Sequence, residues 1–241
     1  MANARVPLDP VADLKRRLVR KQPIAIRALV EHWWNEQGLA QHPPAVGKRI
    51  AFALLEQKAV MHQRAGIVVL GELLADHLRA GDLAALERLF ARRKITDTRV
   101  IDELGVKVLG TLLHRVRGRA DVARALVLWR NAETAWQRRA ACAAFTALAP
   151  KGDDALPNLV QLALSLCSAI VWSVESLDQT AVGWLLRELS RAEPTRIETF
   201  IRRHARFMSR ACLRISIERL APSRQREVVA HWKRATSLRR D

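Results

Sequence analysis

The sequence predicts an all-α fold, a HEAT-like solenoid of stacked antiparallel helix pairs with a concave basic face. Apolar residues recur at helical spacing along nearly the whole chain, and no stretch alternates as a strand would. The expected helices are about 10 to 20 residues long, and pairs of them recur about every 35 to 40 residues. The repeats are too divergent to align with one another, so an irregular helical bundle is the structural alternative.

The expected elements begin at proline-marked breaks. Residues 1–8 are expected to be disordered, and residues 9–241 to form a single DNA-binding domain. The first helix begins at Asp9-Pro10, because a capping residue followed by a first-turn proline favours a helix start. The second begins at Pro23 and ends with Trp33-Trp34. The next three are expected at 46–57, 60–79 and 83–93, the last capped by Asp82.

The next helix has the clearest apolar stripe. Thr96 or Thr98 is expected to cap it, and Arg117-Gly118-Arg119 ends it. Its apolar residues, at spacings that place them on one face of a helix, are Ile101, Leu104, Val108 and Leu112. The remaining expected helices span 121–129, 133–148, 155–171, 176–192, 194–206, 209–220 and 223–239.

The chain is strongly basic, with 41 Lys and Arg against 24 Asp and Glu and a formal net charge of +17. Such an excess favours a polyanionic partner. Nucleic acid is the first expectation, and a membrane surface is the second because some basic helices are amphipathic. No apolar run reaches the roughly 20 residues that span a bilayer, and the N-terminus has no apolar core of a signal peptide.

The scattered cysteines indicate a reduced, cytosolic protein. Cys142, Cys167 and Cys212 lie in apolar helical contexts and are odd in number, so we expect them to be packing residues. No histidine is paired with a cysteine or a carboxylate at the spacing of metal ligands. We therefore expect neither a metal nor a cofactor. The expected location is the bacterial cytosol, on the nucleoid when DNA is bound.

A pair of arginines begins the helix expected at 133–148. Arg138 and Arg139 lie in its first turns, after the polar break 131–134 and before a run of alanines that would let another helix come close. Two cations at a helix N-terminus oppose the helix dipole, which a nearby anion would relieve. The alternative is a solvated basic turn.

A second candidate surface lies in the stretch 180–191. Trp184 shares one helix face with Arg187, Glu188 and Arg191, whereas leucines and a valine occupy the other side. A tryptophan beside arginines on a polar face can pack against a sugar while the cations hold phosphate. The alternative is a Trp184 wedged into the next repeat, with Arg187 paired to Glu188.

Asp102 is a third candidate, in the first turns of its helix. Gly105, one turn later, would leave space around the carboxylate. Beside a basic groove, such a carboxylate could stabilise a developing cation or orient water. The alternative is an acidic residue that complements the helix dipole. Trp33-Trp34 could stack on nucleobases, but a core anchor between early repeats is the favoured interpretation.

These stretches together resemble the AlkD-type DNA alkylation repair family, the HEAT-like-repeat alkylpurine DNA glycosylases. The resemblance runs from Pro23 to Leu220. The segments that carry it are Trp129-x6-Trp136-Gln-Arg-Arg-Ala-Ala, Ala181-Val-Gly-Trp-Leu-Leu-Arg-Glu-Leu followed by Pro194, and Phe207-Met-Ser-Arg-Ala-Cys-Leu-Arg, in which Ala211 or Cys212 replaces the family's Glu.

The resemblance implies hydrolysis of the N-glycosidic bond of cationic alkylated purines in duplex DNA, by a protein that grips the backbone without a base-flipping pocket. We expect the protein to be a monomer. It implies that Asp102 stabilises the oxocarbenium-like sugar and positions water. Trp184 corresponds to an aromatic packed on the deoxyribose. Arg139 and Arg187 correspond to phosphate-binding arginines, and we expect Arg138 and Arg191 beside them to contribute.

One departure from the family lies at Thr98, four residues before Asp102, where the family has a second tryptophan. An aromatic contact to the cationic lesion, of a kind that contributes about 1–2 kcal/mol, is absent there. Two further hypotheses therefore accompany the glycosylase: a non-catalytic DNA-binding paralogue that recognises damaged or unusual DNA, and a protein-binding scaffold in which the charge is incidental.

Overall fold

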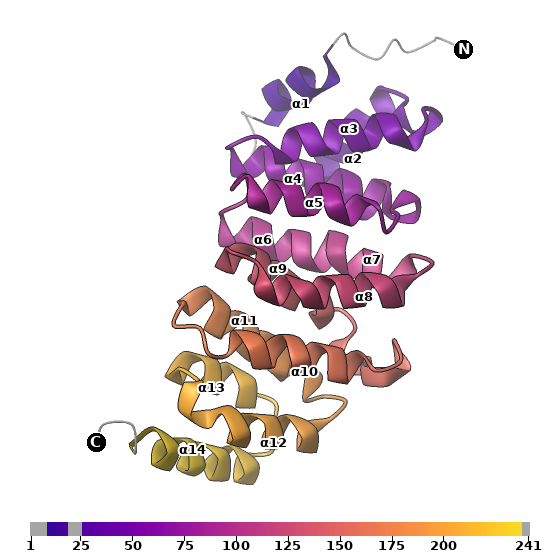
Figure 1. The fold of residues 1–241 in the computed structure, drawn as a ribbon. Coiled ribbons are helices and arrows are strands. Elements are labelled where there is room, and N and C mark those ends of the chain that lie inside the picture. The colour runs from indigo at the N-terminus through magenta and orange to yellow at the C-terminus, as the bar shows by residue number, and fades with distance from the viewer. Residues whose placement is uncertain (1–8, 19–25, 238–241) are drawn as a thin grey trace.

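The protein is a stack of helices in two layers (Figure 1). The computed structural model describes residues 9–18 and 26–237, and these residues contain helices and turns but no strand. The predicted all-α, helical-repeat fold is therefore confirmed. The segment 1–8, the expected helix start at Pro23 and the last residues of the expected C-terminal helix lie outside the described residues.

The rear layer in Figure 1 carries the candidate site. Its helices are α2 (Ile26–Glu36), α4 (Val60–Val68), α6 (Thr98–Leu104), α7 (Gly110–Arg115), α9 (Ala135–Thr146), α11 (Ser176–Leu189) and α13 (Arg210–Ile217). Within this layer each helix packs on the next, α4 on α6, α6 on α9, α9 on α11 and α11 on α13. Residues one repeat apart in the sequence thereby become neighbours in space.

The front layer covers the rear one (Figure 1). Its helices are α3 (Pro44–Leu55), α5 (Asp82–Ala91), α8 (Arg119–Leu128), α10 (Leu159–Ile170), α12 (Pro194–His204) and α14 (Pro222–Ser237). Helix α1 (Pro10–Leu18) packs against α2, α3 and α4 at the N-terminal end of the stack. Short polar breaks and 3₁₀ turns join the layers.

Several helix ends differ from the predictions. The expected helix at 60–79 continues from α4 only through a π-helical turn, Val69–Leu73 (η3), and a second π-helical turn, Gly105–Leu109 (η5), joins α6 to α7. Asp97, not Thr96 or Thr98, caps α6, because its side chain accepts from the backbone N–H groups of Arg99 and Val100. Gly81 precedes α5, so Asp82 is its first residue rather than its cap.

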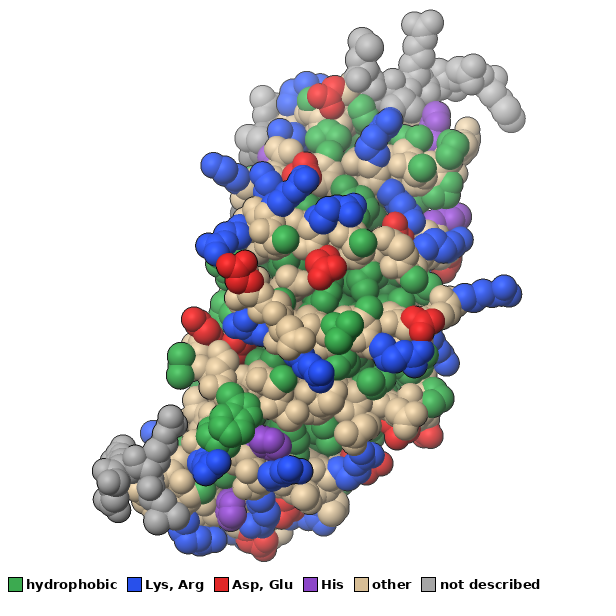
Figure 2. All heavy atoms as spheres, in the orientation of Figure 1, with side chains coloured by type: hydrophobic (Ala, Val, Ile, Leu, Met, Phe, Trp, Pro, Cys, Tyr) green, Lys and Arg blue, Asp and Glu red, His purple; other side chains and the backbone are tan. Residues whose placement is uncertain are grey.

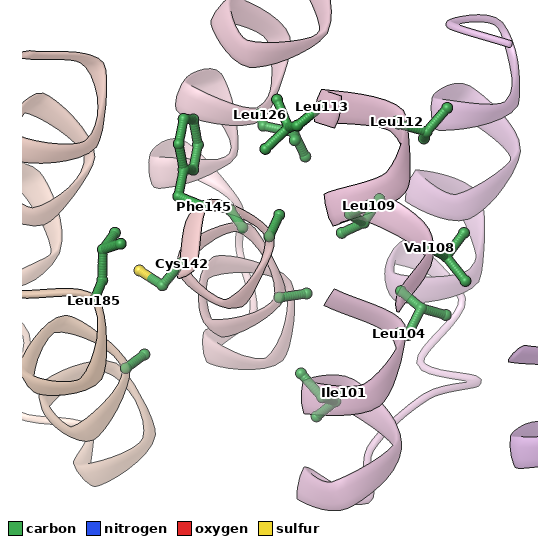
Figure 3. Packing of buried hydrophobic residues seen from close by; sticks show 14 of the residues in the cluster. Ile101, Leu104, Val108, Leu109, Leu112, Leu113, Leu126, Cys142, Phe145 and Leu185 are labelled. Carbon is green, nitrogen blue, oxygen red and sulfur yellow. The ribbon is translucent and has the colours of Figure 1, made fainter. Parts of the chain in front are cut away.

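The core is one apolar cluster that runs from Leu14 to Val228. Trp33 and Trp34 are buried in it, which confirms that they anchor the early repeats. Figure 3 shows the centre of the cluster, where the predicted stripe Ile101, Leu104, Val108 and Leu112 is fully buried. Cys142, Cys167 and Cys212 are buried, free thiols, as predicted.

Glycines and alanines set the spacing within the rear layer. A Cβ atom on Gly105 would lie 2.5 Å from the Cβ of Ala143 and 2.9 Å from the carbonyl oxygen of Ala140. A Cβ atom on Gly183 would lie 2.9 Å from the carbonyl oxygen of Cys212 on α13. The helices can pack so closely only because these side chains are missing or small. The alanine run in α9 therefore has the role that the sequence predicted.

Candidate nucleic-acid interface and active site

Three adjacent rear-layer helices bring Asp102, Arg139 and Thr180 together. Nε and Nη2 of Arg139 donate to the two carboxylate oxygens of Asp102 at 2.7 and 2.9 Å. Nη1 of the same guanidinium donates to Oγ1 of Thr180 at 2.8 Å and to the carbonyl oxygen of Leu177 at 3.3 Å. The predicted catalyst and one predicted phosphate-binding arginine are therefore a single bidentate pair.

The pair lies at the edge of the protein, not in its core. The side chain of Asp102 is 27% exposed and that of Arg139 is 11% exposed. A carboxylate has about four lone-pair positions, of which the guanidinium takes two. Asp102 thus keeps acceptor capacity on its exposed side. Gly105 does not open this space as predicted, because it faces Ala140 and Ala143 of α9.

Arg138 is held from the opposite side of α9. It donates from Nε and Nη2 to the carboxylate of Asp178, which is fully buried on α11, and the shortest of these distances is 2.6 Å. Its Nη1 donates to the carbonyl oxygen of Ala132 at 2.6 Å. The anions that relieve the cationic start of α9 are therefore carboxylates of the two neighbouring helices, one from α6 and one from α11.

The second predicted stretch lies on α11 and just beyond it. Trp184, one turn after Thr180, is half-buried. Arg187 binds Glu188 and Glu218, both at 3.0 Å. Burial alone would lower the pKa of Arg187, but its hydrogen bonds to Glu218 and Glu188 raise the pKa above its ordinary value. Arg191 is exposed and follows the end of the helix.

Thr98 lies one turn before Asp102 on α6 and is half-buried. Residues four apart share a helix face, so Thr98 and Asp102 lie on the same side of α6. Trp33 and Trp34 are buried in the core, so neither of them replaces the family's tryptophan beside Asp102.

Sequence reasoning missed three residues that organise this region. Asp178 and Thr180, the partners of Arg138 and Arg139, follow them by 40 and 41 residues. Gln179 lies between them, buried, and donates to the carbonyl oxygens of Val171, Ser173 and Phe207. Gln63, on α4, makes the same kind of bonds to Leu55, Gln57 and Lys94. For Asp178 and Thr180 the available signal was the repeat spacing, because each lies about one repeat after the arginine that it binds.

The described residues contain no group of His, Cys, Asp and Glu that could hold a metal ion. None of the described helices is long and apolar enough to cross a bilayer. The site consists instead of guanidinium, carboxylate and hydroxyl groups beside a half-buried tryptophan. Such groups can bind phosphate, stabilise a cation and orient water.

Residues 22–220 match the family model described as DNA alkylation repair enzyme. The chain belongs to this family. The fold is also similar to that of a predicted DNA alkylation repair enzyme from Enterococcus faecalis, with a TM-score of 0.68 and 16% sequence identity over 90% of this chain and 98% of that one. No curated protein matches the sequence. The family match agrees with the resemblance drawn from the sequence.

Proposed function

We propose that this member of the DNA alkylation repair family is a glycosylase, which hydrolyses the N-glycosidic bond of cationic alkylated purines in duplex DNA. The observation that carries the proposal is the bidentate pair between Asp102 and Arg139, with part of the carboxylate exposed at the edge of the rear layer. A positioned carboxylate is the group required where positive charge develops on the sugar.

The chemistry needs few catalytic groups because the leaving base is already cationic. As the bond between C1′ and the purine nitrogen breaks, the electron pair goes to the base, which leaves neutral, and the sugar becomes oxocarbenium-like. Asp102 stabilises this positive charge and orients a water molecule. The water adds to C1′ and releases one proton to bulk solvent. Arg139 and Thr180 are positioning residues: Arg139 holds the carboxylate in one orientation, and Thr180 holds Arg139 by accepting a hydrogen bond from its guanidinium.

In this proposal Trp184 and the arginines of α9 and α11 contact the DNA. Trp184 packs on the deoxyribose, and Arg191, which is exposed, is the first candidate for a phosphate contact. Arg187 is partly exposed, and Arg138 and Arg139 would have to exchange carboxylate partners to bind phosphate. In this proposal the protein acts as a monomer in the cytosol, and the DNA backbone lies along the rear layer of the stack.

The first prediction tests the carboxylate. Asp102→Asn keeps the size of the side chain but removes its charge, so single-turnover release of a methylated purine from a duplex with one lesion should fall by about 10²-fold or more. Duplex affinity should stay the same or rise, because Arg139 loses the charge that neutralises it.

Glu103→Gln is the matched control. Glu103 is the next residue on α6, also partly exposed, and pairs with Arg64 of α4. The two variants thus each remove one carboxylate charge from an ion pair between rear-layer helices. Base release that falls equally in both, or that survives in Asp102→Asn, would remove Asp102 from the chemistry.

The second candidate function, a non-catalytic DNA-binding paralogue, is favoured by Thr98. The same assay separates it from the enzyme, because wild-type protein would then bind the duplex with a normal salt dependence and release no base. Thr98→Trp distinguishes an attenuated enzyme from a binder, since restoring the aromatic should raise the rate only where Asp102 is already functional.

A further inference from the structure

Trp172 and Phe207 lie side by side in the turns that follow α10 and α12 and join the front layer to the rear one; Trp172 is exposed and Phe207 is half-buried. Trp172, in the turn that follows α10, is 56% exposed, and Val174 in the same turn is 95% exposed. The rings of Trp172 and Phe207 lie with centroids 3.4 Å apart. Among the described residues, one other large apolar side chain is exposed, that of Leu128 on α8. Exposed apolar side chains that cluster, as Trp172 and Val174 do in this turn, mark a candidate interaction site.

Two hollows meet at Trp172. A groove of about 600 Å³ lies between α10 and α12, and a second hollow of about 450 Å³ lies next to Phe207 and the end of α14. Trp172 lines both hollows, whereas Phe207 lines only the second. The described residues that line the two hollows include Arg196, Arg203, His204 and Arg206 but no Asp or Glu.

The cations around the rings are available to a ligand. Arg203 and Arg206 are exposed, and the Arg206 guanidinium lies 4.5 Å from the centroid of the Phe207 ring. Figure 2 views this face, and its lower part shows green, blue and purple side chains side by side. The patch therefore combines a stacking surface with positive charge.

A buried amide holds the aromatic pair in place. Nε2 of Gln179 donates to the carbonyl oxygen of Ser173, next to Trp172, at 2.8 Å and to that of Phe207 at 3.1 Å. Its Oε1 accepts from the backbone N–H of Ser209 at 2.8 Å. One buried side chain thus ties both aromatic segments to the start of α11. The stacking surface is preorganised, which lowers the entropic cost of binding.

We propose that the groove between α10 and α12, with Trp172 at its end, binds single-stranded DNA by stacking an unpaired base on the indole while Arg203 and Arg206 hold phosphates. An exposed aromatic face with cations and no carboxylate has the composition of a single-strand site. A duplex keeps its base faces covered by their neighbours, so it cannot use the indole. The proposal is independent of the glycosylase chemistry.

The test compares a labelled oligothymidylate of about 12 nucleotides with a duplex of the same length by fluorescence anisotropy. Trp172→Ala should weaken binding of the single strand by about tenfold, because one base loses its stacking partner, and leave duplex affinity unchanged within about twofold. Trp172→Phe should retain most of the affinity. Leu128→Ala, which removes an equally exposed apolar side chain on the front layer, should change neither.

The charge contribution has its own pair of variants. Arg203→Ala should flatten the salt dependence of single-strand binding by about 0.7, the value for one phosphate contact on a single strand. Arg88→Ala, an exposed arginine of α5 that lies in neither hollow, should flatten it less. An oligoglutamate that competes as well as the oligonucleotide would overturn the proposal, because electrostatics alone would then explain the binding.

Three further outcomes would also overturn it: no binding of the single strand by the wild-type protein, equal weakening of single strand and duplex by Trp172→Ala, or full affinity in Trp172→Ala. None of these bears on the glycosylase, because Asp102→Asn should bind the single strand like wild type. Base release from the duplex by Trp172→Ala should likewise equal that of wild type. Failure of one proposal is thus distinguishable from failure of the other.

Discussion

At the scale of single residues, ion pairs between neighbouring helices decide which arginines are available. Arg138 and Arg139 follow one another in the sequence, yet they bind carboxylates on opposite neighbours, Asp178 on α11 and Asp102 on α6. Removing one partner of such a pair leaves a partly buried charge without compensation, which is costly. The two arginines of this stretch therefore hold the rear-layer helices together, and only the exposed parts of their side chains are available to a ligand.

The three cysteines give a prediction at the same scale. Burial raises the pKa of Cys212 to about 12 and raises the pKa values of Cys142 and Cys167 well above the ordinary 9.0. Because the thiolate is the reactive species, a thiol reagent at pH 8 should label none of them within minutes in the native protein and all of them in denaturant. Rapid labelling of the native protein would contradict the buried positions.

The same pKa shifts set a pH dependence of stability. The folded state holds its thiol protons while the unfolded state releases them near the ordinary pKa of 9.0. The folded protein thus binds more protons above that pH, so the free energy of unfolding should fall as the pH rises from about 9 towards 12. Below pH 9 these thiols contribute no pH dependence.

At the scale of elements, close helix approach positions the site. Asp102 reaches Arg139 because α6 packs on α9, and that contact depends on Gly105, whose hydrogen faces Ala140 and Ala143. The π-helical turns η3 and η5 also lie against each other, where a Cβ on Gly71 would meet the carbonyl oxygen of Lys107 at 2.8 Å. Small residues at these crossings thus fix the distance over which the ion pairs form.

Gly105→Ala tests this dependence. The added methyl group would overlap the backbone and side chains of α9, so we expect the free energy of unfolding to fall by about 1–3 kcal/mol. This loss exceeds the stabilisation that alanine gains over glycine from its higher helix propensity. Gly81→Ala is the control, because it has a negative φ and no atom within 4 Å of the added Cβ. Chemical denaturation measures both. A Gly105→Ala protein as stable as Gly81→Ala would contradict the close packing.

At the scale of the whole molecule, the net charge of +17 acts as a field around the stack. Positive charge of this size raises the association rate with DNA and makes affinity depend on salt. However, the slope of log affinity against log salt concentration depends only on the cations that contact a phosphate. The exposed arginines and the paired ones should therefore differ in their effect on that slope.

Duplex binding at several salt concentrations tests this difference. Arg191→Ala, which removes an exposed cation, should reduce the slope by about one unit. Arg139→Ala should reduce it by less, because Asp102 already neutralises that guanidinium, but should lower the rate of base release by freeing the carboxylate to move. A reduction of a full unit in Arg139→Ala would show that Arg139 leaves Asp102 for a phosphate in the complex.

The sequence by itself determined the helical class, the order of the helices and the buried stripe from Ile101 to Leu112, because the spacing of apolar residues within one helix is a local property. The family resemblance also predicted that Asp102, Arg139 and Trp184 belong to one site, and for Trp184 this stays a prediction. Only the tertiary structure decided that Asp102 and Arg139 bind each other, that Arg138 is occupied by Asp178 and that Trp172 is exposed. These facts depend on which residues about 40 positions apart come into contact, and that is settled by how closely the helices pack.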